Sequence, residues 1–196
     1  MTCVSSYRPF GKFPDIDRNQ IISKHSWESV FGGIVYLNQF NVQLWSEHTT
    51  FTGTTKRPRM SELFLTAALL GGVVAVLNSD IVIGNGCSHF LESTIRNGNA
   101  CGFSFRYEFD PVAMNLESAR QVDSGLDFFI ANPGVWYKTF NACPERFIIG
   151  NGEWDSWLFE YWKRKYGRFC VNFTDRKLVF HPKHGDRERE VDPVLA

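Results

Sequence analysis

The sequence predicts an α/β fold whose mixed, mostly parallel sheet is flanked by helices, and three observations support this class. In the first half of the chain, strand-like apolar runs alternate with helix-like segments, the order that builds parallel sheets. Residues 73–77, VVAVL, are apolar throughout, which is typical of a strand buried on both faces. The 196 residues are 43% apolar and 15% aromatic, enough for one domain with a sizeable core.

Turn residues divide the chain into the expected elements. Gly32 and Gly33 end a first helix whose apolar residues recur at helical spacing, and Asp15 or Asp17 would cap its start. The expected helices cover 17–31, 61–70, 88–96 and 153–166. The expected strands cover 2–6, 33–40, 45–51, 73–77, 102–109 and 126–132, with a further short strand ahead of His181.

The helix expected over 153–166 has the clearest pattern in the chain. Basic residues occupy its last turn before Gly167, where they stabilise the carboxyl end of the helix dipole. Its apolar residues form one stripe, made of Trp154, Trp157, Leu158, Tyr161 and Trp162. We expect Trp157 to lie in the core.

Charge and cysteine content argue against several classes of protein. The 21 basic and 21 acidic residues cancel, so the chain has no general attraction to nucleic acid or to an anionic membrane. Five cysteines without a C-x-x-C spacing indicate neither a disulfide framework nor a zinc site. No leader segment and no membrane-spanning apolar run is recognised, and we expect a reduced, cytoplasmic protein.

A carboxylate directly follows the apolar strand at 73–77, in the sequence Asn78-Ser79-Asp80. Open α/β sheets bind ligands just beyond the carboxyl ends of their strands. Asp80 could there hold a hard divalent cation that neutralises a phosphate. Asn and Asp are also common turn residues, and spacing alone favours neither interpretation.

Two further groups of residues could carry chemistry. Glu153 and Asp155 stand at the start of the aromatic helix, where acids stabilise the helix dipole by about 0.3–1 kcal/mol and where the dipole favours their ionised form. One of them could instead act as a general base. His181 and His184 could bind a metal together if Pro182 turns the chain, since residues at i and i+3 of an extended segment point to different sides. Histidines in such positions are otherwise structural or solvated.

Taken in this order, the motifs resemble the GT-A fold of nucleotide-sugar glycosyltransferases. A group of small glycosyltransferase-like proteins of bacteria, plants and viruses is more similar still. The shared pattern consists of Asn-Ser-Asp-Ile at 78–81, Leu-Asp-Phe-Phe at 126–129, Gly-x-x-x-Trp-Asp-x-Trp-Leu at 150–158 and His-x-x-His at 181–184. The opening TCVSSYRPF and the later SKHSWESV are also similar to that group, so the resemblance covers nearly the whole chain. Asn78 departs from the Asp that many GT-A enzymes carry at this position.

The resemblance implies one domain over 1–196, with a nucleotide-binding half at 1–85, an acceptor-binding half at 86–185 and a charged tail at 186–196. It implies a metal-dependent glycosyltransferase that moves a sugar from a UDP- or GDP-sugar donor to a hydroxyl acceptor such as a glycan, with Mn²⁺ or Mg²⁺ as cofactor.

The same resemblance implies roles for individual residues. Asp80 would hold the cation with His181 or His184, and Asp155 would accept the proton of the acceptor hydroxyl if the enzyme inverts. The donor nucleotide and its phosphates would contact Thr2, Val4, Ser5, Arg8, Lys56, Arg59, Asn78 and Ser79. The sugar or the acceptor would contact Arg106, Asp127, Glu153 and Trp154. The basic residues at 56–59 could equally form a plain surface loop.

Three alternatives stay open. A sugar-phosphate nucleotidyltransferase has a related fold, although residues 7–13, YRPFGKF, match its glycine-rich signature loop poorly. A non-catalytic module that binds nucleotide-sugars or glycans could retain the fold. A viral enzyme that glycosylates modified DNA bases is disfavoured by the neutral charge, although residues 162–168, WKRKYGR, could form a basic patch.

Overall fold

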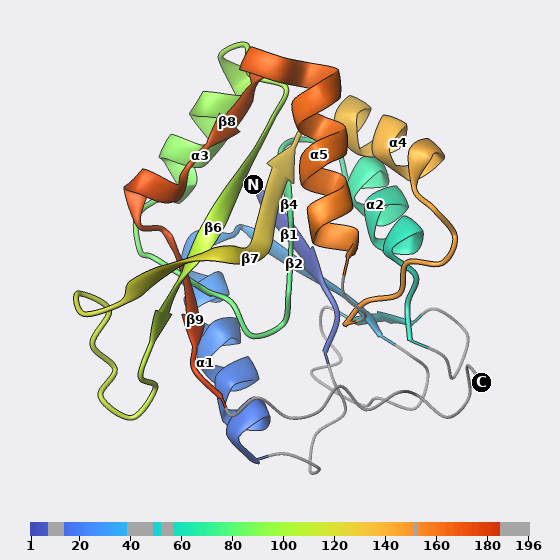
Figure 1. Ribbon diagram of the computed structural model, residues 1–196. Helices are drawn as coiled ribbons and strands as arrows, with labels where there is room; N and C mark the ends of the chain where they lie inside the picture. The colour runs from blue at the N-terminus through green and yellow to red at the C-terminus, as the bar shows by residue number, and fades with distance from the viewer. Residues whose placement is uncertain (8–13, 39–48, 52–56, 151–152, 185–196) are drawn as a thin grey trace.

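The computed structural model describes residues 1–7, 14–38, 49–51, 57–150 and 153–184 (Figure 1). The expected contacts of Arg8 and Lys56 with a nucleotide lie outside the described residues. The same holds for the charged tail at 186–196, for residues 39–40 of the second expected strand and for residues 45–48 of the third.

A single mixed sheet forms the centre of the described structure. Its nine strands follow the order β3-β2-β1-β4-β7-β6-β9-β5, and β8 pairs with β6. The strands are β1 Thr2–Ser5, β2 Gly33–Asn38, β3 Thr49–Phe51, β4 Val74–Leu77, β5 Val82–Ile83, β6 Cys101–Phe109, β7 Arg120–Ala131, β8 Cys170–Asn172 and β9 Val179–Pro182.

The prediction of a mostly parallel sheet is correct only for the first half of the chain. There β3, β2, β1 and β4 all run parallel. The rest of the sheet is mixed: β7 runs antiparallel to both β4 and β6 and β5 runs antiparallel to β9, whereas β8 and β9 run parallel to β6. The cause lies in the connection at 110–119, because two sequential strands joined by a hairpin connection must be antiparallel.

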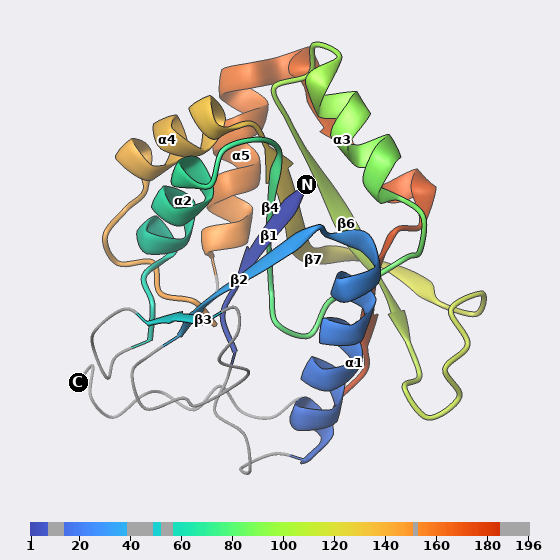
Figure 2. The ribbon, with the colours of Figure 1, turned by 180° about the vertical axis from the view of Figure 1, so that it is seen from behind.

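Helices cover both faces of this sheet. They are α1 Pro14–Val30, α2 Met60–Leu69, α3 Ser88–Arg96, α4 Pro133–Ala142 and α5 Trp154–Tyr166, with short 3₁₀ helices at Gly167–Phe169 and Thr174–Arg176. α2, α4 and α5 share one apolar cluster with the sheet (Figure 1), and α1 and α3 share the cluster on the other face (Figure 2).

One of these helices, α4, is absent from the sequence prediction although its start is well marked. Pro133 occupies the first turn, and the side chain of Asn132 accepts a hydrogen bond from the backbone N–H of Val135 at 3.0 Å. At the first helix, Asp15 and Asp17 lie inside the first turn of α1 and not at its cap.

The central strand β4 has the two-sided burial that its apolar sequence predicts. Val74 and Val76 face the cluster of α2, α4 and α5, whereas Ala75 and Leu77 face that of α1 and α3. The first three of these side chains are 0% exposed and Leu77 is 1% exposed. β4 therefore delivers the residues that follow it to the edge of a closed core.

The apolar stripe of α5 is narrower than the sequence suggests. Its buried residues are Trp154, Leu158 and Trp162, four residues apart, and they pack against the sheet. Trp157 is only half-buried and stacks on Tyr161 with 5.2 Å between the ring centroids. The expected positions of the first two tryptophans are thus wrong, because Trp154 lies in the core and Trp157 on the outer side.

This orientation can be tested by truncation. We expect Trp162→Ala to lower the free energy of unfolding by about 3–5 kcal/mol, because it removes a fully buried indole and leaves a cavity. Trp157→Ala is the matched control on the same helix and should cost clearly less. Chemical denaturation followed by circular dichroism measures both. An equal or larger loss for Trp157→Ala would contradict the orientation of α5.

Candidate functional site

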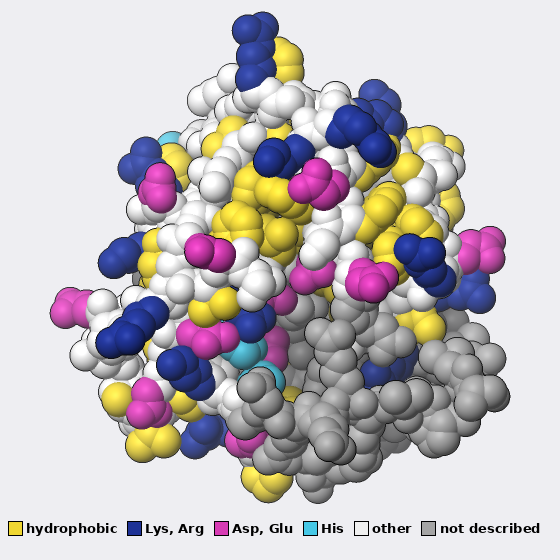
Figure 3. All heavy atoms as spheres, in the orientation of Figure 1, with side chains coloured by type: hydrophobic (Ala, Val, Ile, Leu, Met, Phe, Trp, Pro, Cys, Tyr) yellow, Lys and Arg dark blue, Asp and Glu magenta, His cyan; other side chains and the backbone are white. Residues whose placement is uncertain are grey.

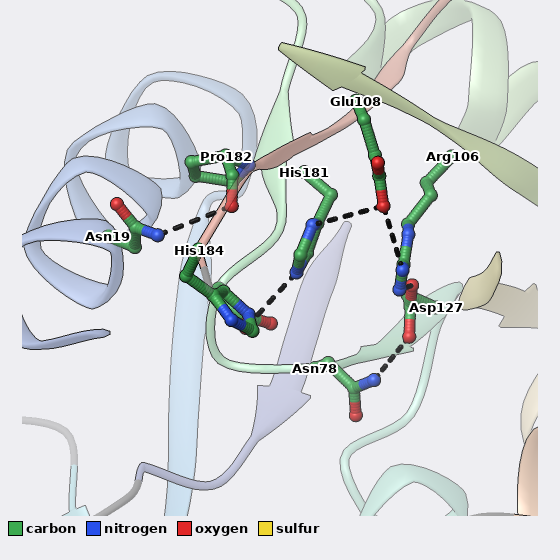
Figure 4. Close-up of polar contacts among 9 residues, drawn as sticks. Asn19, Asn78, Arg106, Glu108, Asp127, His181, Pro182 and His184 are labelled. Atoms are coloured by element: carbon green, nitrogen blue, oxygen red, sulfur yellow. Dashed lines mark hydrogen bonds and ion pairs between the residues drawn. The ribbon is translucent and has the colours of Figure 1, made fainter. Parts of the chain in front are cut away.

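Asp80 meets two histidines from the far end of the chain. It lies in the turn that follows β4, and β5 begins two residues later at Val82, which pairs with Phe180 of β9. This pairing places His181 Nε2 3.3 Å from Asp80 Oδ2, and His184 Nε2 lies 3.4 Å from the same oxygen. Figure 4 shows the two histidines on one side of this part of the chain. Asp80 therefore belongs both to a turn and to a polar cluster.

Both histidines approach one carboxylate, as metal binding would require. In an extended strand, His184 would point to the other side from His181. Because β9 ends at Pro182, this alternation does not apply to His184. The backbone at this point is held from two directions: Asn19 Nδ2 donates to Pro182 O at 3.3 Å, and the N–H of Lys183 donates to Phe109 O at 2.9 Å.

The electrostatics of the cluster favour an ionised carboxylate. Burial alone would raise the pKa of Asp80, but His181 and then His184 together hold that pKa well below its usual value. His181 is 6% exposed, and its ring lies 5.0 Å from that of His184. One ligand atom from each of Asp80, His181 and His184 lies within 4.8 Å of the others, a grouping that could hold a metal ion.

A second set of contacts surrounds Asp127 on β7. Arg106 Nη1 lies 2.6 Å from Asp127 Oδ2, and Arg106 Nη2 lies 3.0 Å from Glu108 Oε1 (Figure 4). The side-chain amide of Asn78 donates to Asp127 Oδ1, and the Asn78 backbone N–H donates to Asp127 O at 3.2 Å. Arg106 thus pairs with both Asp127 and Glu108.

These contacts explain why position 78 carries an Asn and not the Asp that the resemblance would lead us to expect. An Asp there would bring a second carboxylate against that of Asp127, whose side chain is 5% exposed. Asn78 supplies an N–H donor instead. The structure therefore gives Asn78 a role in joining the end of β4 to β7.

A hollow of about 250 Å³ opens beside the histidines, lined by Arg106, Glu108, His181, Lys183 and His184. On the face shown in Figure 3, acidic, basic and histidine side chains gather. Glu108 is absent from the sequence prediction. The sequence contains a signal for it, because successive side chains of β6 point to opposite faces of the sheet. Arg106 and Glu108 therefore lie on the opposite side from Phe105 and Tyr107.

Asp155 lies in the first turn of α5, where its Oδ1 accepts the backbone N–H of Ser156 at 2.8 Å. Its pKa is raised, chiefly by burial and further by the charge of Asp127, against the lowering effects of the backbone amides and of Arg106. The backbone amides at the helix start do lower this pKa, as expected, but burial outweighs them. A raised pKa makes Asp155 a stronger base. The charges that act on its carboxylate are those of Asp127 and of Arg106, and Arg106 lines the hollow.

Two residues expected at the nucleotide, Thr2 and Val4, do not reach this edge. Thr2 lies at the amino end of β1, beside Gly33 and Val74, and Val4 is 0% exposed in the core. Arg59 forms an exposed ion pair with Glu145 at 3.9 Å.

The carboxyl end of β1 does reach the edge. Ser5 is also 0% exposed, and its hydroxyl donates to Leu77 O at 2.8 Å. Ser79 lies in the turn next to Asp80 and is 8% exposed. The hydroxyl of Ser6 donates to Asn38 Oδ1 at 3.4 Å, joining the ends of β1 and β2.

Two expected acceptor residues lie at the start of α5. Glu153 is exposed and has a left-handed backbone, with φ of 82°. Trp154 packs against Phe64 and Phe129 and is 3% exposed, so it offers an acceptor little surface.

No protein-family model matches the sequence, and no curated protein is similar to it. Solved structures do match. One is a Bacillus anthracis protein assigned as a glucose-1-phosphate thymidylyltransferase, determined in complex with sucrose, with a TM-score of 0.52 and 9% identity over 87% of this chain and 85% of that chain. Within the described residues, no helix is long and apolar enough to cross a membrane. The similarity shows that this chain shares the α/β fold of that protein.

Proposed function

We propose that the protein is a metal-dependent transferase that moves a sugar from a nucleotide-sugar to a hydroxyl acceptor such as a glycan. The main support is the convergence of Asp80, His181 and His184 just beyond β4, at the edge where open α/β sheets bind their ligands. The shared fold agrees with an activity on nucleotide-sugars.

The side chains at this edge fit a divalent cation. Asp80 is held ionised, and the histidine nitrogens that face it complete a mixed oxygen and nitrogen donor set. Mg²⁺ prefers oxygen ligands and retains several waters, so two histidines favour Mn²⁺. A cation bound here would stabilise the negative charge of the departing nucleoside diphosphate.

Asp155 is the proposed general base. As the acceptor hydroxyl oxygen attacks the anomeric carbon, its proton passes to the carboxylate of Asp155. The bond between the anomeric carbon and the phosphate oxygen breaks, and the nucleoside diphosphate leaves with the bonding electrons. This single displacement inverts the configuration of the sugar. The burial that raises the pKa of Asp155 supports the assignment.

A sugar-phosphate nucleotidyltransferase is the second candidate, favoured by the activity assigned to the structurally similar Bacillus anthracis protein. Such an enzyme joins a nucleoside triphosphate to a sugar 1-phosphate and releases pyrophosphate. The products that the protein releases distinguish the two reactions. Release of UDP or GDP from a nucleotide-sugar supports sugar transfer, whereas pyrophosphate release from a triphosphate and a sugar 1-phosphate supports nucleotidyl transfer.

We expect UDP or GDP to bind weakly in EDTA and more tightly with Mn²⁺, because the cation would bridge the protein and the diphosphate. Asp80→Asn should weaken Mn²⁺ binding by at least the ~10–100-fold that changes in outer-shell residues cost. Isothermal titration calorimetry measures both effects. Asp123→Asn is the matched control, since Asp123 is an exposed carboxylate on β7. Equal nucleotide affinity in EDTA and in Mn²⁺ would exclude the metal from donor binding.

Asp155→Asn should lower sugar transfer by ~10²–10⁴-fold, the usual contribution of a general base. Donor binding and the melting temperature should change little, because the amide retains the size of the side chain and an acceptor oxygen for Ser156. Glu160→Gln, an exposed carboxylate on the same helix, is the control. Unchanged turnover in Asp155→Asn would show that this side chain only stabilises the start of α5.

A further inference from the structure

The two nitrogens of the His181 ring face two different carboxylates. Nε2 lies 3.3 Å from Asp80 Oδ2, and Nδ1 lies 3.9 Å from Glu108 Oε1. Nδ1 is buried and makes no hydrogen bond within the described structure. Glu108 and His181 are register partners on the parallel strands β6 and β9, so their side chains lie side by side on one face of the sheet.

A chain of contacts links Glu108 to the turn that carries Asp80. Arg106 bonds Glu108 through Nη2 and Asp127 through Nη1, and Asp127 accepts the amide of Asn78, two residues before Asp80. The path of the Arg106 side chain needs Gly125, because a Cβ there would lie 2.6 Å from Arg106 Nε and 2.7 Å from its Cγ. One connected network therefore supports both sides of the candidate metal site.

We propose that Glu108 is a positioning residue for His181: once Nε2 and Asp80 share a cation, Nδ1 carries the ring proton, and the ring closes the 3.9 Å separation to donate that proton to Glu108. Arg106 keeps the carboxylate of Glu108 in place. This inference rests on the metal site of the proposed function. A carboxylate behind a ligating histidine fixes its tautomer and ring orientation, and loss of such a partner typically weakens metal binding by ~10–100-fold.

The test is calorimetric titration of the full chain with Mn²⁺ alone. Glu108→Ala should weaken binding by ~10–100-fold and Glu108→Gln by less, because the amide oxygen can still accept the Nδ1–H. Glu117→Ala, an exposed glutamate in the connection at 110–119, should bind as the parent does.

A second variant reaches the same network without removing a carboxylate. Gly125→Ala should displace Arg106 and weaken Mn²⁺ binding, whereas Gly134→Ala, whose Cβ would be no closer than 3.5 Å to its neighbour, should not. If the parent binds Mn²⁺ and Glu108→Ala binds it equally well, or if Glu108→Gln loses as much affinity as Glu108→Ala, the positioning role is overturned. If the parent itself binds no Mn²⁺, the metal site of the proposed function is overturned instead.

An independent observation concerns two cysteines on neighbouring strands. Cys101 of β6 and Cys170 of β8 are register partners in parallel strands, and both contact the apolar cluster beneath α5. Neighbouring strands lie ~4.8 Å apart, within the range of about 4.4–6.8 Å between Cα atoms that a disulfide spans. Both residues are free thiols in this structure.

The two thiols differ in a way that suits stepwise oxidation. Cys101 is 0% exposed, whereas Cys170 is partly exposed. The neighbouring thiol of Cys101 lowers the pKa of Cys170; burial opposes this effect and the charge of Lys163 adds to it. The neighbouring Cys170 and burial raise the pKa of Cys101. A more acidic, accessible thiol beside a second thiol is the arrangement found in peroxide-sensitive cysteine pairs.

We infer that Cys170 and Cys101 form an oxidisable pair that hydrogen peroxide converts to a disulfide. The Cys170 thiolate attacks one peroxide oxygen, the O–O bond breaks, and the second oxygen leaves as water once protonated. The sulfur of Cys101 then attacks the sulfenic acid of Cys170, forming the S–S bond and releasing a second water. Two thiols lose two electrons, and the peroxide gains them. The bond would tie β8 to β6.

The experiment treats the full chain with hydrogen peroxide and maps disulfides by mass spectrometry without reduction. We expect a linked pair of peptides containing Cys101 and Cys170, which dithiothreitol separates. Cys170→Ser should abolish the link. Cys143→Ser should leave it intact, since burial raises the pKa of that thiol to about 12. Oxidation of Cys170 to a sulfinic acid without the link, or a link to any other cysteine, would overturn the inference.

Discussion

The buried carboxylate of Asp127 is the constraint on which the organisation of the site depends. It stands on β7 between β4 and β6, and each neighbour supplies a partner: Asn78 from the end of β4 and Arg106 from β6. Removing one partner of a buried ion pair typically costs about 3–5 kcal/mol, because it leaves a charge without compensation. From this point, contacts run through Arg106 to Glu108, and through Asn78 to the turn that carries Asp80.

The types of residue and the local spacing of apolar residues predicted much of the structure. The apolar run of β4, the start of α5 and the residues Asp80, His181 and His184 could all be identified, because each signal is local. The reversal of β7 could not, since strand pairing between β4 and β7 depends on contacts across fifty residues of sequence. Glu108 was missed for the same reason, as alternation shows that it shares a face with Arg106 but not what lies beside it.

Two errors came from weighing one physical effect without its competitor. Trp154 and Trp157 both fit a broad helical stripe, and only the packing against Phe129 and Phe147 decides which of them is buried. For Asp155, the helix dipole was the visible effect in the sequence, whereas the desolvation that outweighs it depends on the tertiary structure. The sequence pattern thus identifies the side chains that take part in the core and the site better than it predicts their burial and their pKa.

The pairing of β5 with β9 has a consequence for how the protein is made. Asp80 and His181 are separated by 101 residues, and His184 follows later still. During synthesis, β1, β2 and β4 leave the ribosome long before β9, and chains generally fold from the amino end first. The acidic turn would therefore wait, exposed and without its histidines, until almost the whole described chain has emerged. A nascent or truncated chain that ends before β9 would lack both histidines of the candidate cation site.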